Sequence, residues 1–116
     1  MQRPRPPSNT DIDTRHVTEY IKVVIKTFAD KYTQELYRTG KSKKFPPDIH
    51  SRGARKLEYV NLAERLEDLK VPPGNRLHPL YDDRQGQHAI RINDQWRIFF
   101  RFEDGDAYEV EVCDYH

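Results

Sequence analysis

Side chains that can bind a phosphate and transfer protons are concentrated near the C-terminal end of the sequence. Guanidinium groups suit phosphate because their planar fork matches two oxygens, while imidazole and carboxylate groups exchange protons. Cleavage of a phosphodiester by its own 2′-hydroxyl, without a metal, needs a base, an acid and a cation that stabilises the charge on phosphorus. The candidates are His78, Arg84, Arg91, Arg97, Arg101 and the closing Asp114, Tyr115 and His116.

Each candidate also has a purely structural interpretation. The closing tripeptide can be a frayed end, and His78 can be a packed turn residue beside Pro79. Arg97 lies between aromatic residues on a predicted strand, where it can pair across the sheet with Glu109 or Glu111. From the residue types alone, both interpretations remain open.

Other catalytic chemistries have no motif in this sequence. It contains no glycine-rich phosphate loop, no pair of cysteines and no GxSxG nucleophile turn. The five histidines do not fall at metal-ligand spacing on one helix, so we expect no metal and no cofactor. Cys113 lies in a strand-like run and is expected to pack in the structure.

Composition predicts a single lean domain over residues 21–116, preceded by a flexible extension of residues 1–20. Of the 116 residues, 35% are hydrophobic and 34% are charged, against about 25% charged in a typical domain. No apolar run is long enough for a bilayer, and the N-terminus lacks the apolar segment of a secretory signal. Together with the single cysteine, these features predict a cytoplasmic protein without a membrane partner.

The charge is segregated along the chain although its net value is only +1. Eight basic residues stand against two acidic ones between Lys31 and Lys56, whereas acidic residues gather at Glu58–Asp68 and Glu103–Glu111. A basic face of this kind would attract phosphates, which makes Lys43 and Lys44 candidate RNA contacts. The alternative is that these lysines form ordinary solvated surface.

Local patterns in the first half of the chain predict a short strand and two helices. The strand covers Val23–Phe28, and the first helix covers Lys31–Thr39, capped by Asp30 and ended by Gly40. A second helix is expected to begin near Pro47–Asp48. Its apolar spacing continues through Leu66 and Leu69 until the sequence VPPGN.

The second half reads as an antiparallel meander of HAIRIN, QWRIFFRFE and DAYEVEV, preceded by an edge segment limited by Pro79. Alternation in the middle strand separates an aromatic and aliphatic face from a face with Arg97 and Arg101. In the last strand Tyr108, Val110 and Val112 are expected to share a face. The predicted fold class is α+β, with the N-terminal strand and helical hairpin on one face of a small antiparallel sheet.

Several motifs occur together in the order LHPL, DR-G, IRIN, QWRI, DGDAYEVEV and a closing DYH. Upstream, VVIKTFADKYTQELYRTG, KKFPPDI and RKLEYVNLAERLEDLKVPPGNRL fit the same pattern. From about Val23 to His116 the chain resembles the HigB family of toxins, within the RelE/ParE superfamily. The residues before Val23 have no counterpart in the usual short start of that family.

The resemblance implies two helices against an antiparallel sheet and a type II toxin that cleaves mRNA in the ribosomal A site without a metal, inhibiting translation. The implied partners are the ribosome with its mRNA and a HigA-like antitoxin with a helix-turn-helix domain, through which alone operator DNA is bound. Carried over by motif, Arg97 binds the phosphate, Tyr115 stacks or orients a base, and His78, Asp114 and His116 serve proton transfer. The resemblance leaves open which histidine is the acid.

Arg84 and Arg91 are expected to position mRNA or ribosomal RNA, together with Lys43 and Lys44. Two other functions compete with the nuclease. A ParE-like inhibitor of gyrase would act by binding protein and would not need a terminal histidine. A non-catalytic module for RNA or ribosome binding would show salt-sensitive binding without a cleavage product.

Overall fold

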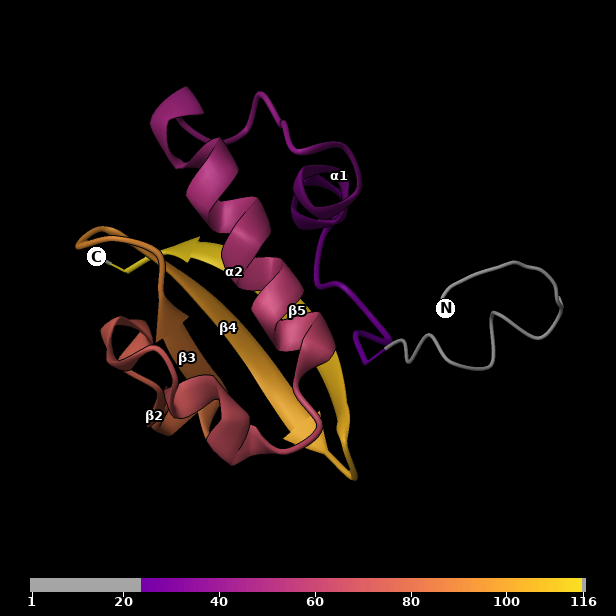
Figure 1. Cartoon of the computed structure of the whole chain (residues 1–116), viewed down its shortest axis with the longest axis vertical. Coiled ribbons are helices and arrows are strands. Elements are labelled where there is room, and N and C mark those ends of the chain that lie inside the picture. The colour runs from indigo at the N-terminus through magenta and orange to yellow at the C-terminus, as the bar shows by residue number, and fades with distance from the viewer. Residues whose placement is uncertain (1–23, 116) are drawn as a thin grey trace, which may run out of the picture.

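A computed structural model describes residues 24–115 of the chain. The predicted extension of residues 1–20, and the predicted role of His116, lie outside these described residues. The fold is α+β, as expected, with two α-helices packed against one face of a four-stranded antiparallel sheet (Figure 1). The strand order is β2-β3-β4-β5, and none of the helices in the described part is long and apolar enough to cross a membrane.

Helix α1 (Lys31–Thr39) has the predicted bounds because both of its ends are capped. The Asp30 side chain accepts a hydrogen bond from the Thr33 amide at 2.7 Å, which satisfies one of the free amides of the first turn. Gly40 ends the helix in the left-handed conformation, at φ 83°, and its amide donates to the Leu36 carbonyl. The Thr33 hydroxyl in turn accepts from the Val112 amide at 3.0 Å and fixes α1 on the sheet.

The prediction that the second helix runs through Leu66 and Leu69 is wrong. A 3₁₀ turn at Pro47–Ile49 leads into α2 (His50–Leu62), and a separate 3₁₀ helix covers Leu66–Lys70. The Asp68 carboxylate accepts hydrogen bonds from the amides of Glu64 and Arg65, and this local cap competes with continuation of α2. Leu69 is buried, as the apolar spacing suggested, but it belongs to the 3₁₀ helix and not to α2.

Two neighbouring strands form most of the sheet, β4 (Trp96–Glu103) and β5 (Asp106–Asp114). Next to β4, on the side away from β5, lies β3 (His88–Arg91). The two-residue β2 (His78–Pro79) pairs with β3 and forms the edge of the sheet, as Pro79 predicted. The predicted alternation in β4 is confirmed, since Ile98 and Phe100 are fully buried against the helices.

The prediction that Tyr108 shares the buried face of β5 is wrong. A β-bulge lies in this strand, where Glu109 has φ 57° and the register shifts opposite Phe99 and Arg101. The extra residue reverses which side chains face the helices on the two sides of the bulge. Ala107 and Val110 are therefore buried, and Tyr108 lies against Arg101. The sequence carries no glycine or proline in this stretch that would have signalled the bulge.

The predicted first strand is represented by an extended segment alongside β5. Two isolated parallel bridges join Ile25 to Ala107 and Phe28 to Val110. The segment crosses the bulge, so its pairing is interrupted rather than continuous. Val23, the expected first residue of this strand, lies outside the described residues.

The helices and the sheet enclose one apolar core. Its members come from α1, α2, the extended segment before α1 and the helix-facing side of the sheet. Helix α2 lies close to α1 because Gly53 leaves room for Leu36, whose Cδ2 atom is 3.2 Å from where a Cβ would stand. Both α-helices of the described residues lie on one face of the sheet (Figure 1), and the opposite face carries the arginines of β4. We call it the free face.

Candidate active site

A pocket of about 450 Å³ opens at one end of the free face. It lies between the edge strand β2, the start of β4 and the chain just after β5. Each of these three segments contributes side chains, so the fold brings together residues that are far apart in sequence. The residues that line the pocket are Arg76, Leu77, His78, Arg97 and Tyr115.

Arg97 is held in the pocket by uncharged partners. Its guanidinium carbon lies 4.3 Å from the centre of the Tyr115 ring, and it donates hydrogen bonds to the backbone carbonyls of Asn93 and Trp96. Within residues 24–115, it forms no ion pair with a carboxylate. Burial, together with the charge of nearby Arg91, lowers the pKa of Arg97 from its usual value. Because a guanidinium stays protonated in proteins even when its pKa is lowered, Arg97 remains a cation, and its charge is available to an anionic ligand.

Two further arginines surround Arg97. Arg91 of β3 is its register partner and holds Asp94 of the following turn, which lowers the pKa of that carboxyl. Arg76 lines the pocket and has a left-handed backbone, with φ 50°. Sequence reasoning missed Arg76, although its position directly before the LHPL motif was a usable signal. The pocket end of the free face is thus electropositive.

His78 stands across the pocket from Tyr115, with ring centres 6.5 Å apart and the planes nearly perpendicular at 88°. Its Nδ1 atom lies 2.7 Å from the Arg76 carbonyl oxygen. Since a carbonyl only accepts, Nδ1 must carry the hydrogen, and in the neutral ring Nε2 is then left as an acceptor. The loop that carries Arg76 therefore fixes the tautomer of His78.

The predicted site residue Asp114 does not line this pocket. Arg97 is the register partner of Cys113 and Asp114 that of Trp96, so Asp114 points away from the face of Arg97. Its carboxylate accepts a hydrogen bond from Gln95 Nε2 at 3.0 Å. His116 follows Tyr115 directly but lies outside the described residues.

Arg84 lies further along the free face, outside the pocket lining. Its guanidinium forms an ion pair with Glu111 at 3.0 Å and covers the Phe99 ring at 4.9 Å. Burial acts to lower its pKa, but the hydrogen bond and charge of Glu111 outweigh burial and raise it. Burial also raises the pKa of the neighbouring Cys113 to about 12, so that this thiol stays protonated and packs as predicted.

No cluster of three or more His, Cys, Asp or Glu side chains that could hold a metal occurs within residues 24–115. The groups gathered at the pocket are instead guanidinium, imidazole and phenol. This combination can bind a phosphate, accept a proton and stack on a nucleobase.

The sequence of the chain is similar to that of known toxins. Residues 26–116 match the family model described as RelE-like toxin of type II toxin-antitoxin system HigB. The chain belongs to this HigB-like toxin family. It is 37% identical to Toxin HigB-1 of Vibrio cholerae serotype O1, over 69% of this chain and 85% of that protein. It is 33% identical to Endoribonuclease HigB of Proteus vulgaris, over 80% of this chain and 100% of that protein.

The resemblance to HigB toxins is therefore confirmed, and membership of a type II system implies an antitoxin partner. A third relative, an uncharacterized protein of Haemophilus influenzae, is 31% identical over 69% of this chain and 80% of that protein.

The predicted RNA contacts Lys43 and Lys44 lie on the helical side of this HigB-like toxin. Lys44 covers the Tyr32 ring at 5.1 Å, and both lysines are exposed. The next residue, Phe45, packs edge-on against Trp96 at 5.6 Å. This contact places the loop that carries Lys43 and Lys44, which we call the basic loop, at the end of the sheet where β4 begins. That end also carries Arg97.

Proposed function

We propose that this HigB-like toxin is an endoribonuclease that cleaves mRNA in the ribosomal A site and thereby inhibits translation. The observation that carries the proposal is that Arg97 and His78 line the same pocket. Arg97 is a cation with no carboxylate partner among the described residues, and His78 is held in one tautomer. The relative named Endoribonuclease HigB, at 33% identity, supports the same activity. Because the reaction takes place on ribosomes, we place the protein in the bacterial cytoplasm.

In the proposed reaction, His78 Nε2 accepts the proton of the ribose 2′-hydroxyl. The 2′-oxygen attacks phosphorus and the bond to the 5′-oxygen breaks, which leaves a 2′,3′-cyclic phosphate and a free 5′-hydroxyl. Arg97 stabilises the extra negative charge of the phosphorane, because its guanidinium can donate two parallel hydrogen bonds to phosphate oxygens. No metal is used in this scheme.

The C-terminal residues complete the proposed site. Tyr115 is 48% exposed and presents a ring on which a nucleobase can stack. We propose that His116 donates the proton to the leaving 5′-oxygen. Asp114 holds Gln95, whose carbonyl accepts from the Tyr115 amide at 2.6 Å, so we assign Asp114 a positioning role at the chain end.

The proposed partners follow the division of charge on the surface. Lys43 and Lys44 contact ribosomal RNA, whereas Arg91 and Arg84 help to position the mRNA along the free face. The antitoxin is proposed to be HigA-like, with a helix-turn-helix domain. Operator DNA is bound only through that antitoxin.

The test is mapping of the 5′ ends of an mRNA on programmed ribosomes, with and without the purified toxin. We expect cuts within the A-site codon, none in free RNA, and cyclic phosphate at the new 3′ ends. A 2′-O-methyl group at the cleaved nucleotide should abolish the cut, because it removes the nucleophile.

The result that contradicts the proposal is an intact mRNA in the presence of folded protein that still arrests growth. Inhibition of gyrase supercoiling by that protein would then identify the ParE-like activity. Salt-sensitive ribosome binding without any cut would identify the non-catalytic module.

A further inference from the structure

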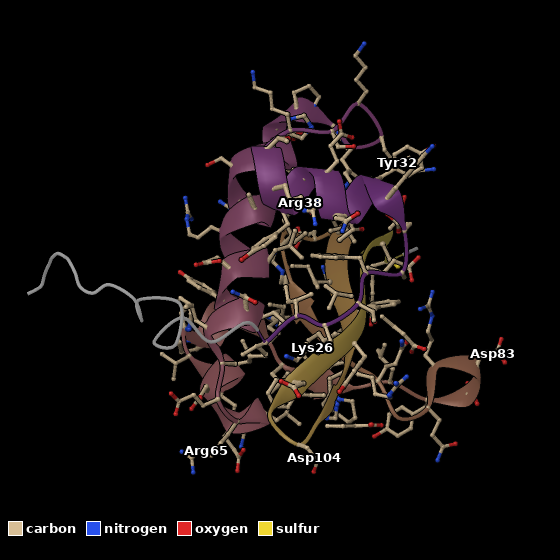
Figure 2. The ribbon with its side chains drawn as sticks, turned by 90° about the vertical axis from the view of Figure 1, so that its right-hand side faces the viewer. Lys26, Tyr32, Arg38, Arg65, Asp83 and Asp104 are labelled. Atoms are coloured by element: carbon tan, nitrogen blue, oxygen red, sulfur yellow. The ribbon has the colours of Figure 1, made fainter. Side chains whose placement is uncertain are left out.

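An apolar groove of about 240 Å³ lies at the other end of the molecule from the basic loop. It is formed by the end of α2 and the 3₁₀ helix that follows, near Arg65 in Figure 2 and opposite Tyr32. Two large apolar side chains remain in solvent here, Leu62 at 64% and Val71 at 71% exposure. Exposed apolar groups side by side usually mark a surface that another segment covers. The groove is lined by Tyr59, Leu62, Ala63, Asp68, Leu69 and Val71.

The described chain begins directly beside this groove. The amides of Val24 and Ile25 both donate to Asn61 Oδ1, at 3.1 Å each. Asn61 immediately precedes Leu62 in α2, so the point at which residues 1–23 join the domain is fixed next to the groove wall.

The residues before this point are an addition to the family pattern. The family match begins at residue 26, and Endoribonuclease HigB of Proteus vulgaris aligns over its whole length with 93 residues of this chain. Ile21 is separated from Val24 by a stretch that spans about 10 Å when extended. The added segment is therefore long enough to lie across the groove.

The composition of the added segment fits the groove. Its last part contains Val17, Tyr20 and Ile21, at the spacing of one apolar helix face. Arg15 and Lys22 outnumber its one acid between residues 14 and 23, Glu19. On the groove side, three acidic residues stand against two basic ones between residues 64 and 70, and all five are exposed.

We propose that residues 15–23 fold back onto their own domain and cover the groove, with Tyr20 and Ile21 against Leu62 and Val71. Leu69 and Val71 connect the groove to the pocket. Their backbone carbonyls accept hydrogen bonds from the buried side chain of Asn75, and Asn75 directly precedes Arg76 of the pocket. Covering the groove therefore braces the loop that supports His78. The docking itself does not depend on the proposed nuclease activity.

The test uses the full chain with a nitroxide spin label on Thr14→Cys, in a Cys113→Ser background. Methyl NMR signals of Leu62 and Val71 should be strongly broadened by the label and recover when the nitroxide is reduced, while those of Leu36 stay sharp. The double variant Tyr20→Asp/Ile21→Asp should remove the broadening. Its matched control, Ile12→Asp, alters an apolar residue outside the docking stretch and should leave the broadening intact.

Two results overturn the proposal. Absence of selective broadening at Leu62 and Val71 would mean that the segment does not cover the groove. Broadening that appears only when spin-labelled chains are mixed with isotope-labelled ones would assign the groove to a second copy of the chain.

Discussion

Two arginines on the same strand and the same face, Arg97 and Arg101, have different surroundings. Each guanidinium lies over a tyrosine ring, Arg97 over Tyr115 at 4.3 Å and Arg101 over Tyr108 at 5.3 Å. Arg101 is also ion-paired with Glu103 at 2.9 Å and with Glu109 at 2.7 Å. The hydrogen bond to Glu109 raises the pKa of Arg101, whereas burial and Arg91 lower that of Arg97.

The comparison teaches that neighbouring charge, and not residue type or strand position, separates a binding arginine from a structural one. Surface ion pairs such as those of Arg101 contribute little to stability, but they cancel the positive field toward a phosphate. At the other end of β4, Arg97, Arg91 and Arg76 stand against a single carboxylate among the described residues, that of Asp94, so a net positive charge remains there. The free face is therefore neutralised at one end and electropositive at the other.

The largest expected effect is the difference in cleavage rate between the Arg97→Ala and Arg101→Ala variants. Loss of a preorganised donor to a transition-state oxyanion costs about 100- to 1000-fold in rate, so Arg97→Ala should slow single-turnover cleavage on ribosomes by that order. Arg101→Ala should change the rate only a few-fold. Equal losses in the two variants would break the distinction between the two ends of the face.

A second matched pair is His78 and His88. His78→Ala should lower the cleavage rate by about 100-fold, the usual scale for a general base. His88 is stacked on the buried Phe100 ring, and burial lowers its pKa, with a smaller contribution from His78. His88→Asn should therefore affect stability more than rate, as read by thermal unfolding beside the cleavage assay. A His88 variant that is folded but as slow as His78→Ala would contradict the assignment of the base.

Much of the fold was predictable from the sequence because its signals are local. Asp30 and Gly40 set the bounds of α1, and period-two alternation set the faces of β4. The end of α2 was not predictable, since it depends on Asp68 folding back to cap a new turn. The bulge at Glu109 likewise depends on cross-strand register and on Thr27, whose hydroxyl accepts from the Glu109 amide at 2.8 Å.

The candidate site was predictable in its residue types but not in its arrangement. Motif position selected His78, Arg97 and Tyr115, and these three line one pocket. Nothing in the local sequence showed that Arg84 is neutralised by Glu111, a residue far along the chain. Arg76 contributes because its loop folds back to line the same pocket as Arg97, a proximity that depends on the tertiary fold.

A smaller effect is expected from the basic loop on the helical side. Lys43→Glu/Lys44→Glu should weaken ribosome binding on the order of tenfold and reduce its salt dependence, because phosphate contacts are lost. The cleavage step on saturated ribosomes should be unchanged, in contrast to Arg97→Ala. A collapse of that step with binding intact would show that the loop belongs to the active site.

The smallest expected effect is a gain, produced by Glu109→Gln. This change removes a carboxylate from Arg101 and makes the neutralised end resemble the end of Arg97. Ribosome or RNA affinity should rise by a few-fold at low salt and return to the parent value at high salt, as an exposed charge requires. A lower affinity in this variant would show that Glu109 acts by holding Arg101 in a required position.

The central claim is that the scissile phosphate binds at the electropositive end of the free face. The most direct measurement is a structure of the toxin on a ribosome programmed with an mRNA that carries a 2′-O-methyl group in the A-site codon. The account predicts the scissile phosphate within hydrogen-bonding distance of Arg97, with His78 Nε2 facing the blocked 2′-oxygen and a base against Tyr115. A phosphate bound at Arg84 or Arg101, with the Arg97 pocket empty of RNA, would contradict it.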